Sequence, residues 1–490
     1  MLDITYASIH ELQEAYREGN LTVKEVVLAH LERIAKIDSC EGGLRSVIEI
    51  NPDALFIAGQ RDRELRENEK MPPLFGIPVL LKDNISTRES MRTSAGSVAL
   101  ADNRSQLSSE IVYRMRDAGA VIIGKTNMTE FANYMTRDGM PNGYSSRGGQ
   151  TLCPYNRAKD PSGSSTGSAV AVAAGLSTVS IGTETSGSII APAGQNGVVG
   201  IKPTLGLVAR DGVIPISHTF DTVGPMARSV TDAAALLGVI SSACSSDAAT
   251  EVWEADKWPR SSRKPKDYTT SLIIAGQRLD GIRIGLNRTK ELANAKEGDE
   301  SIAAFDKFCG LLTDAGATLV DNLEMEPRYD TRMTIMRHEF KACINAYLNR
   351  YASVNSCRIG TLKDIIGYNQ ANTATALKYG QSLLLDAENK SSSNLTESAY
   401  LEALIEREKA IVEMDNLFND HNLDVFLGDA FVYIAPFTGF PSMTMPIGQR
   451  QDNNMPLHAS WTAKRLDEAK MINIAYIAEK LLGLSMRPEI

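Results

Sequence analysis

Apolar residues near the start of the chain recur at helical spacing. Thr22 and Glu25 match a Ser/Thr-x-x-Glu capping box, and valine, leucine and isoleucine residues then form one stripe as far as Ile37. Ser8 and Glu11 form an earlier box of the same kind. The pattern predicts two helices, over residues 8–18 and 22–38, that pack on a larger body.

Short apolar runs then alternate with helical patterns. Ile77–Leu81 has the pattern of a buried strand and ends in the polar Lys82-Asp83-Asn84. Similar patterns predict strands at Val121–Ile123, Thr178–Gly182, Ile282–Leu286 and Thr318–Val320, and a strand–turn–strand region at Val425–Pro446. Helices are predicted near Glu110–Ala118, Ala169–Ala174, 300–315, 332–351, 362–387, 397–420 and 467–482. This alternation indicates an α/β protein with a parallel or mixed sheet.

Composition and charge exclude several classes of protein. The 490 residues carry a formal net charge of −9, which opposes binding to nucleic acid or to an anionic membrane surface. The N-terminus lacks a basic segment followed by an apolar one, and no apolar run is long enough to cross a bilayer. The six cysteines lie far apart without a CxxC pair. We therefore expect a cytoplasmic protein with reduced thiols and no metal site.

Two loops rich in glycine and serine flank the alanine-rich helix and the strand after it. They are Gly163–Ser168 and Thr185–Ser188. Such loops expose backbone N–H groups that hold a phosphate or a developing oxyanion. Neither loop contains the Gly-Lys of a P-loop, which leaves a hydroxyl nucleophile beside an anion hole.

The first loop also matches a nucleophile elbow, with Ser165 as the nucleophile of a Ser–His esterase. That elbow requires a strand immediately before it. The preceding residues 157–161 are polar and include a proline, which disfavours a central strand. Histidines do follow later in the chain, so this hypothesis stays open.

The ordered motifs resemble those of the amidase signature family. Gly163–Ala171, Gly182–Ile189 and Gly197–Thr204 resemble the signature itself. Gly76-Ile77-Pro78 before Lys82, together with Gly124–Met128 and Asp221–Met226, resembles the family's other marks. Among the branches, Gly182–Thr185 and Arg147–Thr151 look most like the peptide amidases and their bacterial and fungal relatives. The resemblance implies one domain over residues 1–490, in which a large mixed sheet is covered by helices on both faces. The signature core would span about 72–240, followed by a polar surface segment at about 241–280.

The same resemblance implies the catalytic residues. Ser188 would be the nucleophile, Ser164 the bridging serine and Lys82 the base, with the peptide bond before Ser164 in the cis form. The backbone N–H groups of Thr185, Ser186, Gly187 and Ser188 would form the oxyanion hole. Lys82 can accept a proton only when neutral, so burial must lower its pKa by roughly 3 units, at a cost of about 4 kcal/mol. We expect Ser165 and Ser168 to support the bridging serine by hydrogen bonds.

The substrate pocket is less well defined by the sequence. Met128, Phe131 and Phe437 are candidates for an acyl pocket. The sequence departs from the common family pattern in four places. Glu184 replaces an aspartate, Ser186 a glycine and Ile190 a frequent arginine, and Met455–His458 replaces a glycine-bearing stretch. None of these involves the three catalytic candidates, but they prevent any transfer of substrate preference from relatives.

The predicted function is hydrolysis of a small-molecule amide, anilide or carbamate through a seryl acyl-enzyme, without metal or cofactor. Two other classes stay open. An amidotransferase A-type subunit would release ammonia from glutamine inside a complex, and a silent relative would only bind or scaffold. The sequence leaves open whether the chain forms a homodimer.

Overall fold

The first two helices begin where the capping boxes place them. A computed structural model describes residues 2–67, 71–88, 90–251, 267–272, 278–287, 299–321, 323–326, 328–352, 359–428 and 433–490. Ser8 and Thr22 each accept the N–H of the glutamate three residues on, and both capping boxes are complete. They start α1 (Ile9–Arg17) and α2 (Val23–Arg33), and a π-helical turn at Ile34–Asp38 carries α2 to its predicted end.

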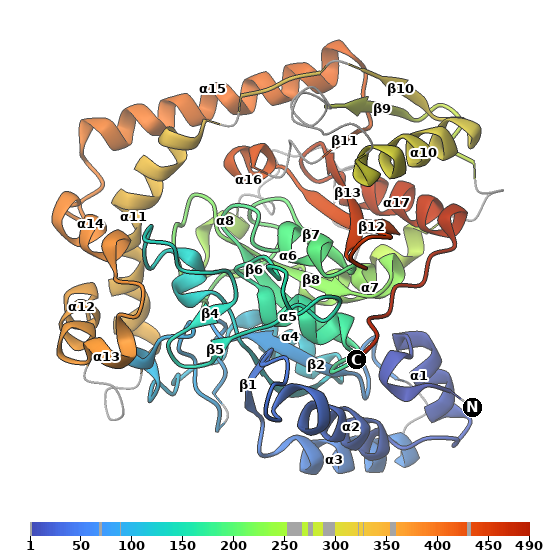
Figure 1. Ribbon diagram of the computed structural model, residues 1–490, viewed down its shortest axis with the longest axis horizontal. Coiled ribbons are helices and arrows are strands. Elements are labelled where there is room, and N and C mark those ends of the chain that lie inside the picture. Colours follow the sequence, from blue (N-terminus) through green and yellow to red (C-terminus); the bar gives the residue numbers. More distant parts are fainter. Residues whose placement is uncertain are drawn as a thin grey trace.

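The described strands form one mixed sheet of eleven, together with a separate pair (Figure 1). The large sheet has the order β1-β3-β2-β6-β8-β7-β12-β13-β11-β9-β10. Neighbours are parallel along β3-β2-β6 and along β11-β9-β10, and antiparallel elsewhere. Its strands are β1 (Val47–Ile50), β2 (Pro78–Lys82), β3 (Val121–Thr126), β6 (Val179–Glu184), β7 (Val199–Lys202), β8 (Thr222–Ala227), β9 (Arg283–Leu286), β10 (Thr318–Val320), β11 (Val425–Leu427), β12 (Ser442–Gln449) and β13 (Pro456–Ala463). The separate pair is β4 (Tyr144–Ser145) and β5 (Gly149–Gln150).

Helices cover both faces of this sheet, as predicted (Figure 1). α5 (Thr166–Ala173) and α6 (Ile190–Gln195) pack together on the central strands, and α7 (Val230–Ile240) and α17 (Glu468–Leu482) form a second pair. Every residue of α5 is buried. Gly167 explains this close approach, because a Cβ there would lie 2.4 Å from the backbone oxygens of Asn127 and Ser46.

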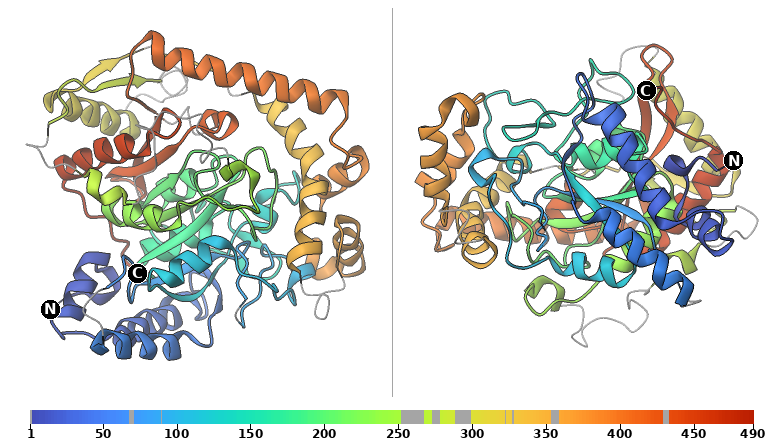
Figure 2. Two further views of the ribbon diagram at one scale, coloured as in Figure 1. Left: turned by 180° about the vertical axis from the view of Figure 1, so that it is seen from behind. Right: turned by 90° about the horizontal axis from the view of Figure 1, so that it is seen from below.

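A group of helices from residues 329–420 lies along one side of the sheet (Figure 2). It contains α11 (Tyr329–Tyr351), α12 (Leu362–Ala371), α13 (Thr373–Ala376), α14 (Ser382–Lys390) and α15 (Ser398–Asp420). These helices share a second hydrophobic cluster with the segment around Tyr134. The single helix predicted over 362–387 was wrong. The helix breaks at Asn372 and again after Ala376, and Gly380, with a φ of +77°, lies in the turn before α14.

The predicted strand–turn–strand region was also incomplete. α16 (Ile434–Thr438) lies between β11 and β12, and Gly439 ends it with a φ of +79°. β12 pairs with β13, a strand that the apolar pattern did not identify. The remaining helices in the described part of the chain are α3 (Ala54–Glu67), α4 (Glu110–Asp117), α8 (Ala248–Glu251) and α10 (Glu300–Asp314), with 3-10 turns at Ile4–Tyr6, Val98–Leu100, Glu130–Asn133 and Tyr268–Ser271.

The predicted surface segment at 241–280 lies partly outside the described residues, which leave out 252–266 and 273–277. Within the part that is described, Tyr268 is only 1% exposed and belongs to the main core. The segment therefore returns to the core before β9. None of the described helices combines the length and the apolar character that a membrane span requires.

Candidate active site

Lys82 is the last residue of β2, and the sheet carries it into the interior. Its side chain is fully buried. Nζ lies 2.9 Å from Ser164 Oγ, 2.9 Å from Ser165 Oγ and 3.1 Å from the Thr183 carbonyl oxygen. Burial lowers the pKa of Lys82 to about 7, although the carboxylates of Asp221 and Glu184 act in the opposite direction. A large fraction of Lys82 is therefore neutral near pH 7.

Ser164 begins the turn that leads into α5. The peptide bond between Gly163 and Ser164 is cis, which confirms the sequence prediction. The carbonyl oxygen of Ser164 accepts the N–H of Thr129 at 3.1 Å. Ser164 is fully buried. The turn thus presents the Ser164 hydroxyl to Lys82 across 82 positions of sequence.

Ser165 and Ser168 have different surroundings. Ser165 Oγ donates to the Thr183 carbonyl at 2.9 Å and accepts from Lys82. No strand leads directly into Ser165, because residues 151–163 are described and contain none. The nucleophile elbow requires such a strand. Ser168 Oγ donates instead to the Ile181 carbonyl at 3.0 Å and lies 2.8 Å from Thr126 Oγ1. Ser165 therefore supports the lysine directly, whereas Ser168 joins α5 to its neighbouring strands.

The loop from Thr185 to Ser188 lines a pocket of about 560 Å³. The Ser188 carbonyl oxygen accepts the N–H of Ser165 at 3.1 Å, which holds the end of this loop beside the Ser164 turn. Gly187 has a φ of +79°, a conformation that glycine adopts without strain. Ser188 is 7% exposed and faces the pocket together with Ser162 and Gly163. Ser188 thus lines the pocket, and its backbone is bonded to the turn in which Ser164 contacts Lys82.

Two buried carboxylates position this loop. Glu184 accepts the N–H groups of Ile189 at 2.7 Å and Ile190 at 3.1 Å, and Asp221 accepts Thr185 Oγ1 at 2.5 Å. Burial raises the pKa of both carboxyls. The N–H of Gly187 also interacts with Glu184, so this predicted oxyanion donor has a competing acceptor. Asp221 was part of a family motif in the sequence, but nothing there indicated its contact with Thr185.

The three predicted acyl-pocket residues lie in the second hydrophobic cluster. Met128, Phe131 and Phe437 are each at most 2% exposed, and Phe131 packs edge-on against Phe340 at 6.4 Å between ring centres. None of them is among the described residues that line the pocket. Side chains from four other regions do line it, namely Tyr134, Thr136, Arg137, Met140, Asn142, Tyr329, Arg332, Met333, Met336, Leu383 and Tyr433. Sequence reasoning missed these residues because most belong to helices and loops distant from the signature.

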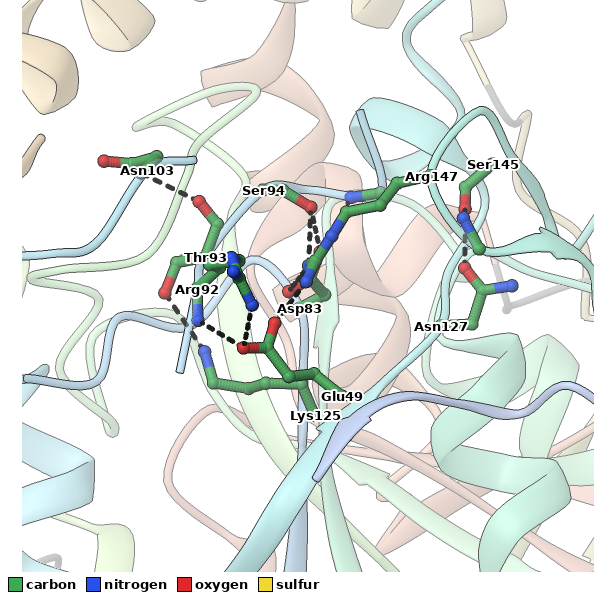
Figure 3. Close-up of polar contacts among 12 residues, drawn as sticks. Glu49, Asp83, Arg92, Thr93, Ser94, Asn103, Lys125, Asn127, Ser145 and Arg147 are labelled. Atoms are coloured by element: carbon green, nitrogen blue, oxygen red, sulfur yellow. Dashed lines mark hydrogen bonds and ion pairs between the residues drawn. The ribbon is translucent and has the colours of Figure 1, made fainter. Parts of the chain in front are cut away.

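A network of charged and polar side chains includes Asp83, the residue after Lys82 (Figure 3). Arg147 forms ion pairs with Glu49 and, at 3.3 Å, with Asp83, the residue after Lys82. Asp83 also accepts the N–H of Gly96 at 3.0 Å. Lys125 donates to the Ile85 carbonyl at 2.6 Å and to Thr93 Oγ1 at 3.0 Å. These contacts hold the chain on either side of the loop that follows Lys82.

Fold and site together define a class of protein, an α/β protein in which a buried lysine contacts two serine hydroxyls beside a pocket-lining loop rich in glycine and serine. Known proteins are similar to this chain both in sequence and in fold. A family model described as Amidase matches residues 25–428. A probable amidase of Arabidopsis thaliana is 35% identical over 99% of this chain and 92% of its own length. The native peptide amidase of Stenotrophomonas maltophilia superposes with a TM-score of 0.89 and 39% identity, covering 99% of this chain and 98% of that one.

The chain belongs to the amidase family. It is an amidase, a hydrolase that acts on carbon–nitrogen bonds. A glutamyl-tRNA(Gln) amidotransferase chain of Caldanaerobacter subterraneus subsp. tengcongensis is more distant, at 27% identity over the whole chain and 99% of its own length.

Proposed function

We propose that the protein hydrolyses linear amides through a covalent acyl-enzyme on Ser188. The observation that carries the proposal is the contact between Lys82 Nζ and Ser164 Oγ, 2.9 Å long and fully buried. A serine hydroxyl becomes a good nucleophile only when a base removes its proton. Neutral Lys82 is that base, and the Ser164 hydroxyl donates and accepts in turn to pass the proton on.

The remaining steps use groups that surround the pocket. The N–H groups of Thr185 and Ser186 stabilise the negative oxygen of the tetrahedral intermediate, while that of Gly187 is shared with Glu184. The proton held by Lys82 then returns through Ser164 to the leaving nitrogen as the carbon–nitrogen bond breaks. Water next attacks the acyl group on Ser188, and the relay takes its proton and returns it to Ser188 Oγ as the bond between Oγ and the acyl carbon breaks and the carboxylic acid leaves. Each step conserves protons without a further co-reactant.

Residue-specific labelling tests the nucleophile. A fluorophosphonate should add one mass increment to the full chain, and peptide mass spectrometry should locate it on Ser188. Ser188→Ala should abolish labelling, whereas Ser186→Ala keeps the nucleophile in the same pocket and should retain it. A label on Ser165 would overturn the proposal in favour of the Ser–His esterase.

Purified protein should then be screened against primary amides, anilides and carbamates. Turnover of a primary amide by the chain alone supports the proposal. Glutamine hydrolysis that appears only with added partner proteins would indicate an amidotransferase component instead. Complete absence of labelling and turnover would indicate a protein that only binds.

A further inference from the structure

Arg332 lies in the first turn of α11 and lines the active-site pocket. It is 6% exposed, and its guanidinium carbon lies 5.0 Å from the ring centre of Tyr329 and 5.4 Å from that of Tyr433. Nη1 is buried without a hydrogen-bond partner in the described part of the chain. The two rings hold the guanidinium in place, but neither supplies a full negative charge.

An arginine in this position is costly to the folded protein. Arginine stays protonated in proteins, and a buried cation without an anion loses its hydration uncompensated. Burial lowers the pKa of Arg332, and only the weak influence of Tyr329 and Tyr433 opposes it. Arg210 shows the usual solution, because it pairs with Asp247 at 2.7 and 2.9 Å and its pKa is raised. Arg332 thus has the surroundings of a cation whose anion comes from outside the chain.

The charge of the pocket also indicates that its ligand is an anion. Arg137 and Arg332 both line it, and the described lining residues include no aspartate or glutamate. This positive pocket belongs to a chain with a formal net charge of −9. A cleft lined by one sign of charge concentrates ligands of the other sign.

We propose that Arg332 binds a carboxylate on the substrate, so that the preferred substrates are amides whose acyl part carries an acidic group. The inference rests on the proposed function, because it places the substrate between Ser188 and Arg332 in one pocket. A planar carboxylate matches the fork of N–H donors on a guanidinium, and Nη1 supplies an unused donor. In a primary amide the leaving group is ammonia, so a carboxylate on such a substrate belongs to the acyl part.

A ladder of substrates tests the inference. The monoamides of linear dicarboxylic acids with two to eight methylene groups place a carboxylate at increasing distance from the amide. Amides with a methyl ketone in place of the carboxylate are neutral partners of similar shape. We expect kcat/KM to favour the carboxylate by about 10- to 100-fold at one preferred length, as for a hydrogen bond between charged groups. Arg332→Gln should remove that preference while changing kcat/KM for the methyl ketones less than about threefold, and Arg332→Lys should restore part of it.

Arg137→Gln is the matched control, because it removes an exposed arginine from the same pocket. It should leave most of the preference intact, since exposed charges are strongly screened. Binding gives a readout independent of turnover. By calorimetry, Ser188→Ala protein should bind the free dicarboxylate of preferred length, and adding Arg332→Gln should weaken binding at least tenfold.

The outcomes separate this inference from the proposed function. Turnover of the neutral amides without any preference for a carboxylate would overturn the inference and leave the function standing. An equal loss on both substrate series in Arg332→Gln, with a lower Tm, would assign Arg332 a purely structural role. No turnover of either series and no labelling of Ser188 would instead contradict the proposed function itself.

Discussion

Two buried lysines occupy neighbouring strands of the sheet, and they differ in what they touch. Lys82 ends β2, and Lys125 lies one strand away in β3, opposite Leu81. Both are fully buried, and burial lowers their pKa values to about 7 and about 8. Lys82 contacts the hydroxyls of Ser164 and Ser165, in the turn that is hydrogen-bonded to the Ser188 loop. Lys125 contacts the Ile85 carbonyl and the Thr93 hydroxyl, in the segment that follows β2.

The comparison shows that a lowered pKa does not identify a catalytic base. Removal from water alone brings a buried lysine close to neutrality. What separates Lys82 is its hydroxyl neighbour Ser164, because the next residue, Ser165, donates its backbone N–H to the carbonyl of the pocket-lining Ser188. Lys125 lies close to the carboxylates of Asp83 and Glu49, which raise its pKa and belong to the network around Arg147. One lysine is placed to exchange a proton, the other to hold a loop.

Replacing each lysine in turn should give the largest difference in kcat between the two regions. Lys82→Arg and Lys82→Ala should both lower kcat by a factor of about 10³ or more, because neither side chain can accept a proton. Lys125→Met should leave kcat within about tenfold. It should lower the free energy of unfolding by about 1–3 kcal/mol, because the Ile85 carbonyl loses its partner. Steady-state kinetics and denaturant unfolding measure the two effects, and near-normal turnover in Lys82→Arg would exclude the relay.

Removing the bridging hydroxyl should have the next largest effect. Ser164→Ala should lower kcat by roughly 10²–10³, the range of a single acid–base step, without raising KM to the same degree. Ser168→Ala is the matched control, because Ser168 bonds to Ile181 and Thr126 rather than to Lys82. Equal losses of kcat in the two variants would show that Ser164 acts only through packing.

The effect of pH on kcat/KM should be smaller than that of removing the Ser164 hydroxyl, and it should depend on Lys82. The working base is neutral, so kcat/KM should rise about 100-fold from pH 5 to pH 8, through a pKa of about 7, and then level off. A histidine base would titrate in nearly the same range, so the profile needs a variant. Asp221 raises the pKa of Lys82, and Asp221→Asn should therefore move the rising limb to lower pH. A rising limb that moves to higher pH in Asp221→Asn would contradict the assignment of Lys82 as the base. A shift in Lys125→Met instead would contradict it as well.

The smallest expected effect is that of a chelator. In the part of the chain that the structure describes, no group of three histidine, cysteine, aspartate or glutamate side chains is placed to hold a metal ion. EDTA and mild thiol alkylation should therefore change the initial rate by less than about twofold. Inhibition by EDTA that one added metal reverses would show that the serine–lysine site does not act alone.

The sequence by itself determined the first two helices and several elements up to β6, although it did not predict α6, α7, β7 or β8. Capping boxes at Ser8 and Thr22 and the apolar run before Lys82 depend on neighbours within a few residues, so local patterns revealed them. The ordered motifs also identified the family, and with it the serine and lysine candidates. The pattern failed at 362–387 and at β13, where turns and strand pairing depend on distant contacts.

Only the tertiary structure decided how charges and cavities are arranged. The strand order brings Lys82 to Ser164 across 82 positions, and it places Asp221 against Thr185. The predicted pocket residues Met128, Phe131 and Phe437 are instead part of the second core cluster, and Arg332 comes to the pocket from α11. The physical reason is that burial and electrostatic interaction depend on which segments pack together in space. Sequence spacing carries no record of that packing once two residues belong to different elements.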